Sequence, residues 1–243
     1  MTRQLTIITG ASSGIGAAIA AAALESPSAG SVVATISRRS GPGTHLAADL
    51  ADPASWSSVA AWIDQLITAD VERVALIHNA GTLDPIGFAG EVDHDRYTAN
   101  VLLNSASVQV IGAAFLASMA RADLPGVYMN ISSGAGKNPF AGWSSYCAGK
   151  AAGDMWIRTA GIELDARASA VRVVSVSPGV VATAMQAEIR SAETAAFPNV
   201  ARFHELFEQG NLADPAQVGA KLYALANRHD LPQGGVFSVD DTI

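Results

Sequence analysis

Short apolar runs alternate with longer segments of helical periodicity along most of the chain. The runs that predict buried β-strands are residues 4–9, 31–36, 45–48, 73–77, 126–130, 171–176 and 235–239. Between them, apolar residues recur three and four positions apart, most clearly in residues 53–66, 94–120 and 215–225, which predicts helices. Alternating strands and helices are typical of a doubly wound parallel sheet. We therefore expect a single α/β domain over residues 1–243, with a sheet of about seven strands flanked by helices.

Residues 184–212 depart from this alternation. Their apolar residues, among them Met185, Ile189 and Phe203, are scattered among polar ones. The segment is too long for an ordinary connection between a strand and a helix. We expect it to form a lid over a binding site and to contain short helical pieces.

The composition supports one well-buried domain. The 243 residues are 49% hydrophobic and 15% charged, with a mean hydropathy of +0.25, which suits a parallel sheet covered on both faces. No apolar run reaches the roughly 18 residues that a membrane span needs. The N-terminus lacks the basic segment and cleavage site of a secretory signal. We therefore expect a soluble cytoplasmic protein that has no membrane partner.

Charge and cysteine content argue against two kinds of site. A formal net charge of −7 and a pI near 5.1 disfavour a nucleic-acid partner, because phosphate binding needs clustered Lys and Arg. The single cysteine, Cys147, can form no internal disulfide and supplies no Cys-rich metal site. We expect no metal ion.

Tyr146 and Lys150 form a candidate proton-transfer pair. Residues four apart lie on the same face of a helix, so this spacing places a phenol beside an ammonium group. A nearby cation stabilises the phenolate and lowers its pKa from about 10, which brings proton transfer within reach at neutral pH. The spacing is common by chance, so the alternative is that Tyr146 and Lys150 are an ordinary pair on a helix surface. The remaining motifs decide between the two interpretations.

A glycine-rich turn follows the first predicted strand. It reads Gly10-Ala11-Ser12-Ser13-Gly14-Ile15-Gly16 and leads into an alanine-rich helical segment that reaches residue 24. Glycines let the backbone turn sharply and approach a ligand closely, and the start of a helix offers free N–H groups to a diphosphate. A strand, a glycine turn and a helix in this order predict a nucleotide site.

The second predicted strand ends in Ser37-Arg38-Arg39, without an acidic residue. An acid at this point binds the ribose hydroxyls of NAD, whereas the guanidinium groups of Arg38 and Arg39 suit the oxygens of a 2′-phosphate. We therefore predict NADP(H) as the cofactor. The alternative is that both arginines are solvated loop residues.

These motifs resemble the short-chain dehydrogenase/reductase family. The spacing Gly-x-x-x-Gly-x-Gly, the tetrad His78-Asn79-Ala80-Gly81 and the Pro178-Gly179 turn stand in the family's order, with His78 in place of an Asn. The resemblance implies a Rossmann fold and an oxidoreductase. With Arg38 and Arg39, the expected cofactor-binding residues are Gly10, Ser12, Ser13, Gly14, Ile15, Gly16, Arg38, Arg39, Asp49, Leu50, Asn79, Ala80, Gly81, Tyr146, Lys150, Pro178, Gly179, Val181 and Thr183.

The same resemblance assigns catalytic roles to four residues. Tyr146 would protonate the carbonyl oxygen of a small-molecule substrate while the nicotinamide delivers hydride. Lys150 would lower the pKa of Tyr146 and bind the nicotinamide ribose, and Ser133 would hydrogen-bond the carbonyl oxygen. Asn104 would hold a water that links Lys150 to solvent and returns the proton.

Two of these positions have a competitor nearby. Asn100 and Asn104 are both amides in an otherwise apolar helical run, and a buried amide without a partner costs roughly 1–3 kcal/mol. Ser132 and Ser133 both follow the fifth predicted strand. Spacing within the family favours Asn104 and Ser133.

Within the family, residues 130–133 and 140–155 resemble sepiapterin reductase and the bacterial benzil reductases. This resemblance implies NADPH-dependent reduction of a ketone or of one carbonyl in a vicinal diketone. Ser133, Tyr146 and Met185 are expected substrate contacts, and Trp143 would form an aromatic wall beside them. The alternative for Trp143 is packing under the start of its helix.

The C-terminal region bears on the substrate. Sepiapterin reductase binds its pterin through a carboxylate near the C-terminus, and the matching position here is Ser238, with Asp240 and Asp241 close by. A broader dicarbonyl reductase is therefore favoured.

Two other functions are weighed against this one. The missing acid after the second strand disfavours an NAD-dependent secondary-alcohol dehydrogenase, and the complete set of four catalytic residues disfavours a non-catalytic nucleotide-sensing protein.

The helix that begins near His94 and the one that carries Tyr146 show small and apolar residues on more than one face. Together with the resemblance, this implies a homodimer or homotetramer.

Overall fold

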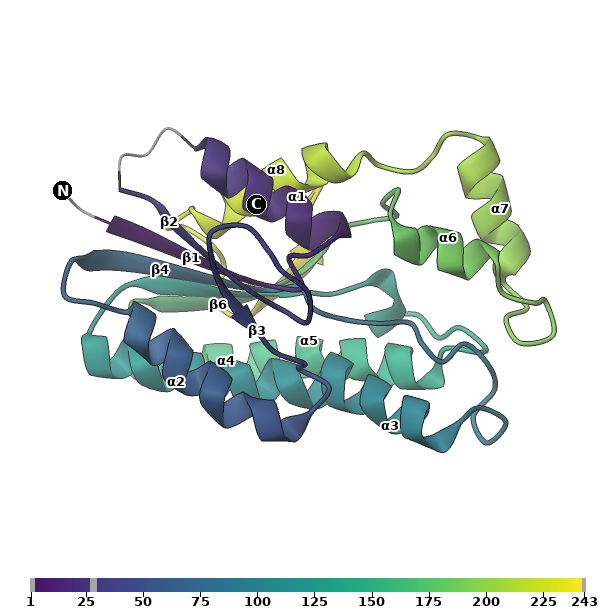
Figure 1. The fold of residues 1–243 in the computed structure, drawn as a ribbon, viewed down its shortest axis with the longest axis horizontal. Coiled ribbons are helices and arrows are strands. Elements are labelled where there is room, and N and C mark those ends of the chain that lie inside the picture. Colours follow the sequence, from purple (N-terminus) through teal and green to yellow (C-terminus); the bar gives the residue numbers. More distant parts are fainter. Residues whose placement is uncertain (1–2, 27–29, 242–243) are drawn as a thin grey trace.

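A parallel sheet of seven strands runs through the centre of the molecule in the residues that the computed structural model describes, 3–26 and 30–241 (Figure 1). The strand order is β3-β2-β1-β4-β5-β6-β7. The bounds are β1 (Arg3–Thr9), β2 (Val32–Ser37), β3 (Thr44–Ala47), β4 (Val71–His78), β5 (Gly126–Ile131), β6 (Val171–Ser177) and β7 (Gly235–Ser238). The predicted single-domain doubly wound sheet and its seven strands are confirmed, with strand ends shifted by one or two residues.

Strand β1 shows why these segments form a buried sheet. Leu5 and Ile7 belong to the apolar core on one face of the sheet, and Ile8 belongs to the core on the other face, because successive side chains of a strand point to opposite faces. All three side chains are at most 1% exposed. Both faces of the sheet are thus apolar and require helices to cover them.

Helices cover both faces. Helices α1 (Gly14–Glu25) and α8 (Pro215–Ala226) lie on one face, and α2 (Trp56–Leu66), α4 (Ser107–Ala122) and α5 (Ser144–Asp165) lie on the other (Figure 1). α1 and α8 approach closely at Gly219, where a Cβ atom would lie 2.6 Å from the backbone of Ala18. Two short 3₁₀ segments, η1 (Pro53–Ser55) and η3 (Gly134–Gly136), precede α2 and follow β5.

The predicted helix over residues 94–120 is one continuous helical segment with a π-helical turn inside it. It consists of α3 (His94–Val101), the π-helical segment η2 (Leu102–Ala106) and α4. By length and composition the segment His94–Ala122 could cross a membrane, although Asn104, Ser107 and Gln109 interrupt its apolar residues. Here it is a core helix, because Ile111, Phe115 and Met119 are buried in the core beside the sheet.

Helices α6 (Ala184–Arg190) and α7 (Val200–Glu208) stand apart from both layers, at one end of the sheet (Figure 1). They are the helical pieces expected within residues 184–212. Phe197, Val200 and Phe203 of this segment form a third apolar cluster with Trp143 and Tyr146. This cluster fixes α7 against the start of α5.

Candidate active site

The carboxyl ends of the central strands meet at one edge of the sheet. Thr9 of β1 pairs with Ile36 of β2 and with His78 of β4, and His78 pairs with Asn130 of β5. The loops that follow these strands are therefore neighbours, and in open α/β sheets ligands bind beyond this edge. The glycine turn, the Arg38–Arg39 pair and the Asn79-Ala80-Gly81 sequence all lie there.

The glycine turn has the shape that a diphosphate requires. Gly10 and Gly14 adopt positive φ angles of 69° and 55°, and a Cβ atom on Gly16 would lie 2.4 Å from the carbonyl oxygen of Gly10. Side chains at these positions would strain or block the turn. Ser13, which precedes α1, makes no side-chain cap, so the first N–H groups of this helix are free to bind an anion.

Asn79 holds the glycine turn in place. Its Nδ2 donates to the carbonyl oxygens of Thr9 and Gly10, at 3.2 and 3.3 Å, and the Thr9 hydroxyl accepts from the backbone N–H groups of Asn79 and Ala80, both at 3.0 Å. The strand ends of β1 and β4 are thereby locked together. The first cavity, of about 240 Å³, opens beside them.

Arg38 and Arg39 line this first cavity together with Asp49 and Leu50. The Arg38 guanidinium lies 3.8 Å from the Asp49 carboxylate, and both side chains are largely exposed. A dinucleotide fits this arrangement, because the glycine turn provides N–H groups for the diphosphate and the two arginines line the same cavity.

A second cavity, of about 640 Å³, continues from the first. The residues that line both cavities are Ile15, Asn79, Gly81, Thr183 and Met185. The second cavity also contains Ser133, Tyr146 and Lys150 on one side and residues of α6 and α7 on another. The predicted Pro178, Gly179 and Val181 line it as well. One continuous space therefore connects the arginine pair with the Tyr146 hydroxyl.

Tyr146 and Lys150 lie one turn apart on α5 and are 7% and 5% exposed. The Lys150 Nζ donates to the carbonyl oxygen of Ile131 at 2.8 Å and lies 5.7 Å from the centre of the Tyr146 ring. Burial lowers the pKa of Lys150 to about 8, although the nearby Asp154 carboxylate opposes this shift. At neutral pH Lys150 is therefore still protonated.

The pKa of Tyr146 differs from the sequence-based expectation. Burial raises it to about 12, and a hydrogen bond with Ser133 opposes that shift. Lys150 directs its ammonium group to Ile131 and lies beside the Tyr146 ring, and desolvation of the phenolate is the largest cause of the shift in the Tyr146 pKa. The buried phenol is held in its protonated form, ready to donate.

The geometry separates Ser133 from Ser132. Ser133 hydrogen-bonds the Tyr146 side chain and also accepts from the Ala135 backbone N–H at 3.2 Å. Ser132 is 4% exposed, and its hydroxyl has no hydrogen-bond partner among the described residues. The structure therefore brings Ser133, and not Ser132, to the phenol.

Asn104 lies in the π-helical turn, beside Lys150. Its Nδ2 donates to the Thr82 carbonyl oxygen at 2.8 Å and to Asn100 Oδ1 at 2.9 Å, and its Oδ1 accepts from the Thr82 N–H at 3.2 Å. A Cβ atom on Gly81 would lie 2.9 Å from Asn104 Oδ1 and 3.4 Å from Lys150 Nζ. The absence of a side chain at Gly81 thus leaves the space between these two groups open. π-Helical turns inside α-helices are frequent at functional sites.

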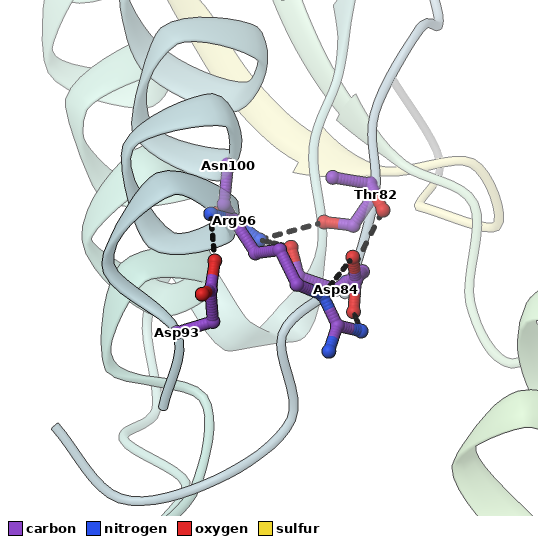
Figure 2. A network of polar contacts seen from close by, with 5 residues as sticks. All are labelled: Thr82, Asp84, Asp93, Arg96 and Asn100. Carbon is purple, nitrogen blue, oxygen red and sulfur yellow. Dashed lines mark hydrogen bonds and ion pairs between the residues drawn. The ribbon is translucent and has the colours of Figure 1, made fainter. Parts of the chain in front are cut away.

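Asn100 holds the loop at Thr82 and Asp84 in place, a role that the sequence did not reveal. Its Nδ2 donates to the carbonyl oxygens of Thr82 and Asp84, the Asp84 carboxylate pairs with Arg96, and Asp93 caps α3 through the Arg96 N–H (Figure 2). Asn100 is fully buried. The two asparagines are therefore partners rather than competitors, and both hold the loop that begins at Gly81.

A second polar network lies beneath Lys150. Asn130 Nδ2 donates to Ser175 Oγ at 2.9 Å, and Ser175 Oγ donates to Asp154 Oδ1 at 2.6 Å. It joins β5, β6 and α5. Asp154 is 2% exposed, and its position four residues after Lys150 is the signal by which the sequence could have revealed it.

Trp143 both packs and lines the second cavity. Its ring stacks on Phe197 with centroids 4.3 Å apart and meets Tyr146 edge to face at 5.8 Å. Trp143 is 4% exposed, yet it borders the cavity, as does Met185. Trp143 therefore packs under the start of α5 and also borders the cavity, and its contact with a substrate stays a prediction.

The C-terminal carboxylates are engaged elsewhere. Asp240 pairs with Lys221 at 2.6 Å, and Asp241 accepts from the Ser238 N–H at 2.7 Å. Neither is among the described residues that line the second cavity. In the same part of the chain, no group of three His, Cys, Asp or Glu residues is arranged to hold a metal ion.

Known proteins resemble the whole chain. The family model described as short chain dehydrogenase matches residues 4–194. A benzil reductase ((S)-benzoin forming) of Bacillus subtilis (strain 168) is 36% identical over 231 residues, which cover 93% of this chain and 94% of the relative. A sepiapterin reductase of Rattus norvegicus is 31% identical over 253 residues, which cover 94% of this chain and 93% of the relative. The crystal structure of the KRED1-Pglu enzyme aligns with a TM-score of 0.81 at 28% identity and covers 96% of this chain and 99% of its own.

His78 is a buried histidine near Lys150, and folding shifts its pKa. It is 1% exposed, and because the Ser107 hydroxyl donates to the Leu103 carbonyl oxygen, His78 Nε2–H donates to Ser107 Oγ at 3.2 Å. Burial, with a smaller contribution from the Lys150 charge, lowers the pKa of His78 from 6.5 to about 3. The folded protein therefore holds His78 neutral.

Replacing His78 by Asn should make the protein less sensitive to acid. The folded pKa lies below the unfolded one, so stability is complete above about pH 6.5 and falls as the pH drops toward 3. Between pH 7 and pH 5 we expect the wild type to lose about 2 kcal/mol more free energy of unfolding than His78→Asn. Urea unfolding at both pH values measures this difference, and equal losses in the two proteins contradict it.

Proposed function

The chain belongs to the short-chain dehydrogenase family, and from this premise we propose that it is an NADPH-dependent reductase of ketones and vicinal diketones. The observation that carries the proposal is the position of the Tyr146 phenol and the Ser133 hydroxyl in one cavity that continues into the glycine turn. Relatives named benzil reductase and sepiapterin reductase, which match nearly the whole chain, support a carbonyl substrate.

Tyr146 is the proton donor in this proposal. The bound nicotinamide supplies the hydride. The raised pKa of Tyr146, about 12, keeps the phenol protonated until negative charge develops on the substrate oxygen. Ser133, which already hydrogen-bonds Tyr146, donates to the same oxygen and stabilises that charge.

Lys150 and Asn104 restore the proton. Lys150 is protonated at neutral pH and stands between the Ile131 carbonyl oxygen and the open space at Gly81. A water in that space, held by Asn104, would pass a proton from solvent toward Lys150 and Tyr146. Lys150 also binds the nicotinamide ribose in this proposal, which leaves its charge close to the phenolate that forms.

The remaining residues of the two cavities hold the cofactor and the substrate. The diphosphate binds the glycine turn and the start of α1, Asp49 and Leu50 contact the adenine end, and Val181 and Thr183 hold the nicotinamide carboxamide. Trp143 and Met185 border the substrate, and α6 and α7 serve as its lid. Arg38 and Arg39 bind the 2′-phosphate of NADP(H).

We further propose a cytoplasmic homodimer or homotetramer. The outer faces of α3, α4 and α5 carry exposed apolar side chains, with Val101, Val110, Met155 and Ile162 between 40% and 72% exposed. A second copy of the chain would cover them. Light scattering measures this assembly.

Replacing Tyr146 by Phe should lower kcat about a thousandfold for a vicinal diketone, because the proton donor is removed. NADPH binding, followed by the fluorescence of the cofactor, should change little. Tyr223→Phe is the matched control, because Tyr223 lies on α8 and borders neither cavity. Substantial reductase activity in Tyr146→Phe, with the control unaffected, contradicts the proposed role.

The cofactor preference should depend on the arginine pair. We expect kcat/KM with NADPH to exceed that with NADH, and the ratio to fall at least about tenfold in the double variant Arg38→Ala/Arg39→Ala, a loss of about 1.4 kcal/mol. The control is Arg167→Ala, which removes a positive charge on the loop between α5 and β6, away from the residues that line both cavities. Similar efficiencies with both cofactors in the wild type would refute the NADP assignment.

A further inference from the structure

The second cavity has an unusual charge distribution for this protein. The chain carries 22 acidic and 15 basic residues, yet the described residues that line this cavity include two cations, Lys150 and Arg202, and no carboxylate. Lys150 donates to the Ile131 carbonyl oxygen and has a role in the proposed reaction. Arg202 is the charge that the proposed mechanism does not use.

Arg202 is held at the cavity by the residue that follows it. Phe203 packs on Trp143 with ring centroids 5.5 Å apart, and Trp143 in turn meets Tyr146. The backbone of α7 is therefore fixed next to the aromatic wall. The Arg202 side chain is exposed, which places it at the open side of the cavity.

Arg202 makes no ion pair among the described residues. Arg96 pairs with Asp84, and Arg190 stacks on the ring of Phe207 at 4.0 Å. Glu205, one turn further along α7, makes no ion pair with Arg202 in that same part of the chain. The guanidinium is therefore available to a ligand, and its planar set of donors suits a carboxylate.

Two neutral amides border the cavity with Arg202. Asn199 lies three residues before it at the start of α7, and Gln186 comes from α6. Gln186 is 7% exposed, and its Oε1 has no hydrogen-bond partner in the described residues. An amide can turn its NH₂ group toward an anion. The lid side of the cavity thus carries one cation and two amides that can donate hydrogen bonds.

We propose that the substrate is a ketone or vicinal diketone that carries a carboxylate, and that Arg202 binds this carboxylate while the reacting carbonyl lies at Tyr146 and Ser133. The inference rests on the proposed function and adds its substrate class. Asp240 and Asp241, which could attract a cationic group, are engaged outside the cavity, so the charge at the site selects anions.

The test compares a neutral phenyl methyl diketone with its para-carboxyl derivative. With NADPH, we expect the wild type to show the higher kcat/KM for the carboxylated substrate. Arg202→Gln should lower the ratio of the two kcat/KM values about fivefold, and Arg202→Glu should lower it further. Arg167→Gln should leave the ratio unchanged. A ratio that is the same in the wild type and Arg202→Gln overturns the inference.

A binding measurement separates this inference from the proposed function. Benzoate and benzamide, which are not reduced, are titrated into the NADP⁺-bound protein while tryptophan fluorescence is followed. The anion site is supported if benzoate binds more tightly than benzamide and loses this advantage in Arg202→Gln. This result supports the anion site even if neither diketone is reduced, and in that case only the proposed function fails. If the neutral diketone is reduced and benzoate binding does not depend on Arg202, the anion site is overturned. The proposed reductase function is then unaffected.

Discussion

The burial of Lys150 is the interaction on which the rest of the site depends. An ammonium group taken out of water is costly, and three features offset that cost: the Ile131 carbonyl oxygen at 2.8 Å, the Asp154 carboxylate one turn along α5, and the Asn130–Ser175 bonds that hold Asp154 in place. Gly149 lets α5 come close to η2, because a Cβ atom there would lie 2.7 Å from the Asn104 side chain. A protonated lysine can therefore stay beside a buried phenol at neutral pH.

The strand ends connect this charge to the two cavities. Thr9 and Asn79 lock β1 to β4 under the glycine turn, and the Asn100 and Asn104 amides hold the loop after Gly81. The same polar groups thus fix the backbone around the glycine turn and the open space between Gly81 and Lys150, where we propose that a dinucleotide and a water bind. The aromatic cluster of Trp143, Phe197 and Phe203 then places α7 over the Tyr146 side of the cavity. In the proposed function, the strand ends carry the reacting groups, and the α6–α7 segment borders the substrate.

The sequence predicted what depends on local pattern. Alternating apolar runs located all seven strands, and the glycine turn located the start of α1. The sequence did not predict the properties that depend on burial or on contacts between distant residues. The Tyr146 pKa rises because the folded chain removes solvent from the phenol, and no spacing reveals that. Asn100 and Asn104 looked like alternatives in the sequence, but they hydrogen-bond each other. Arg202 stood in a mixed segment, and only the packing of Phe203 on Trp143 brings it to the cavity.

In the proposed reaction, one continuous space holds the hydride donor and the Tyr146 proton donor at the same carbonyl group. The most direct test incubates the purified protein with benzil and NADPH that carries deuterium at the transferable position of the nicotinamide ring, followed by mass spectrometry of the product. We expect an alcohol with one deuterium on the carbon that bears the new hydroxyl group. An alcohol without deuterium, or no alcohol while the cofactor is bound, contradicts it.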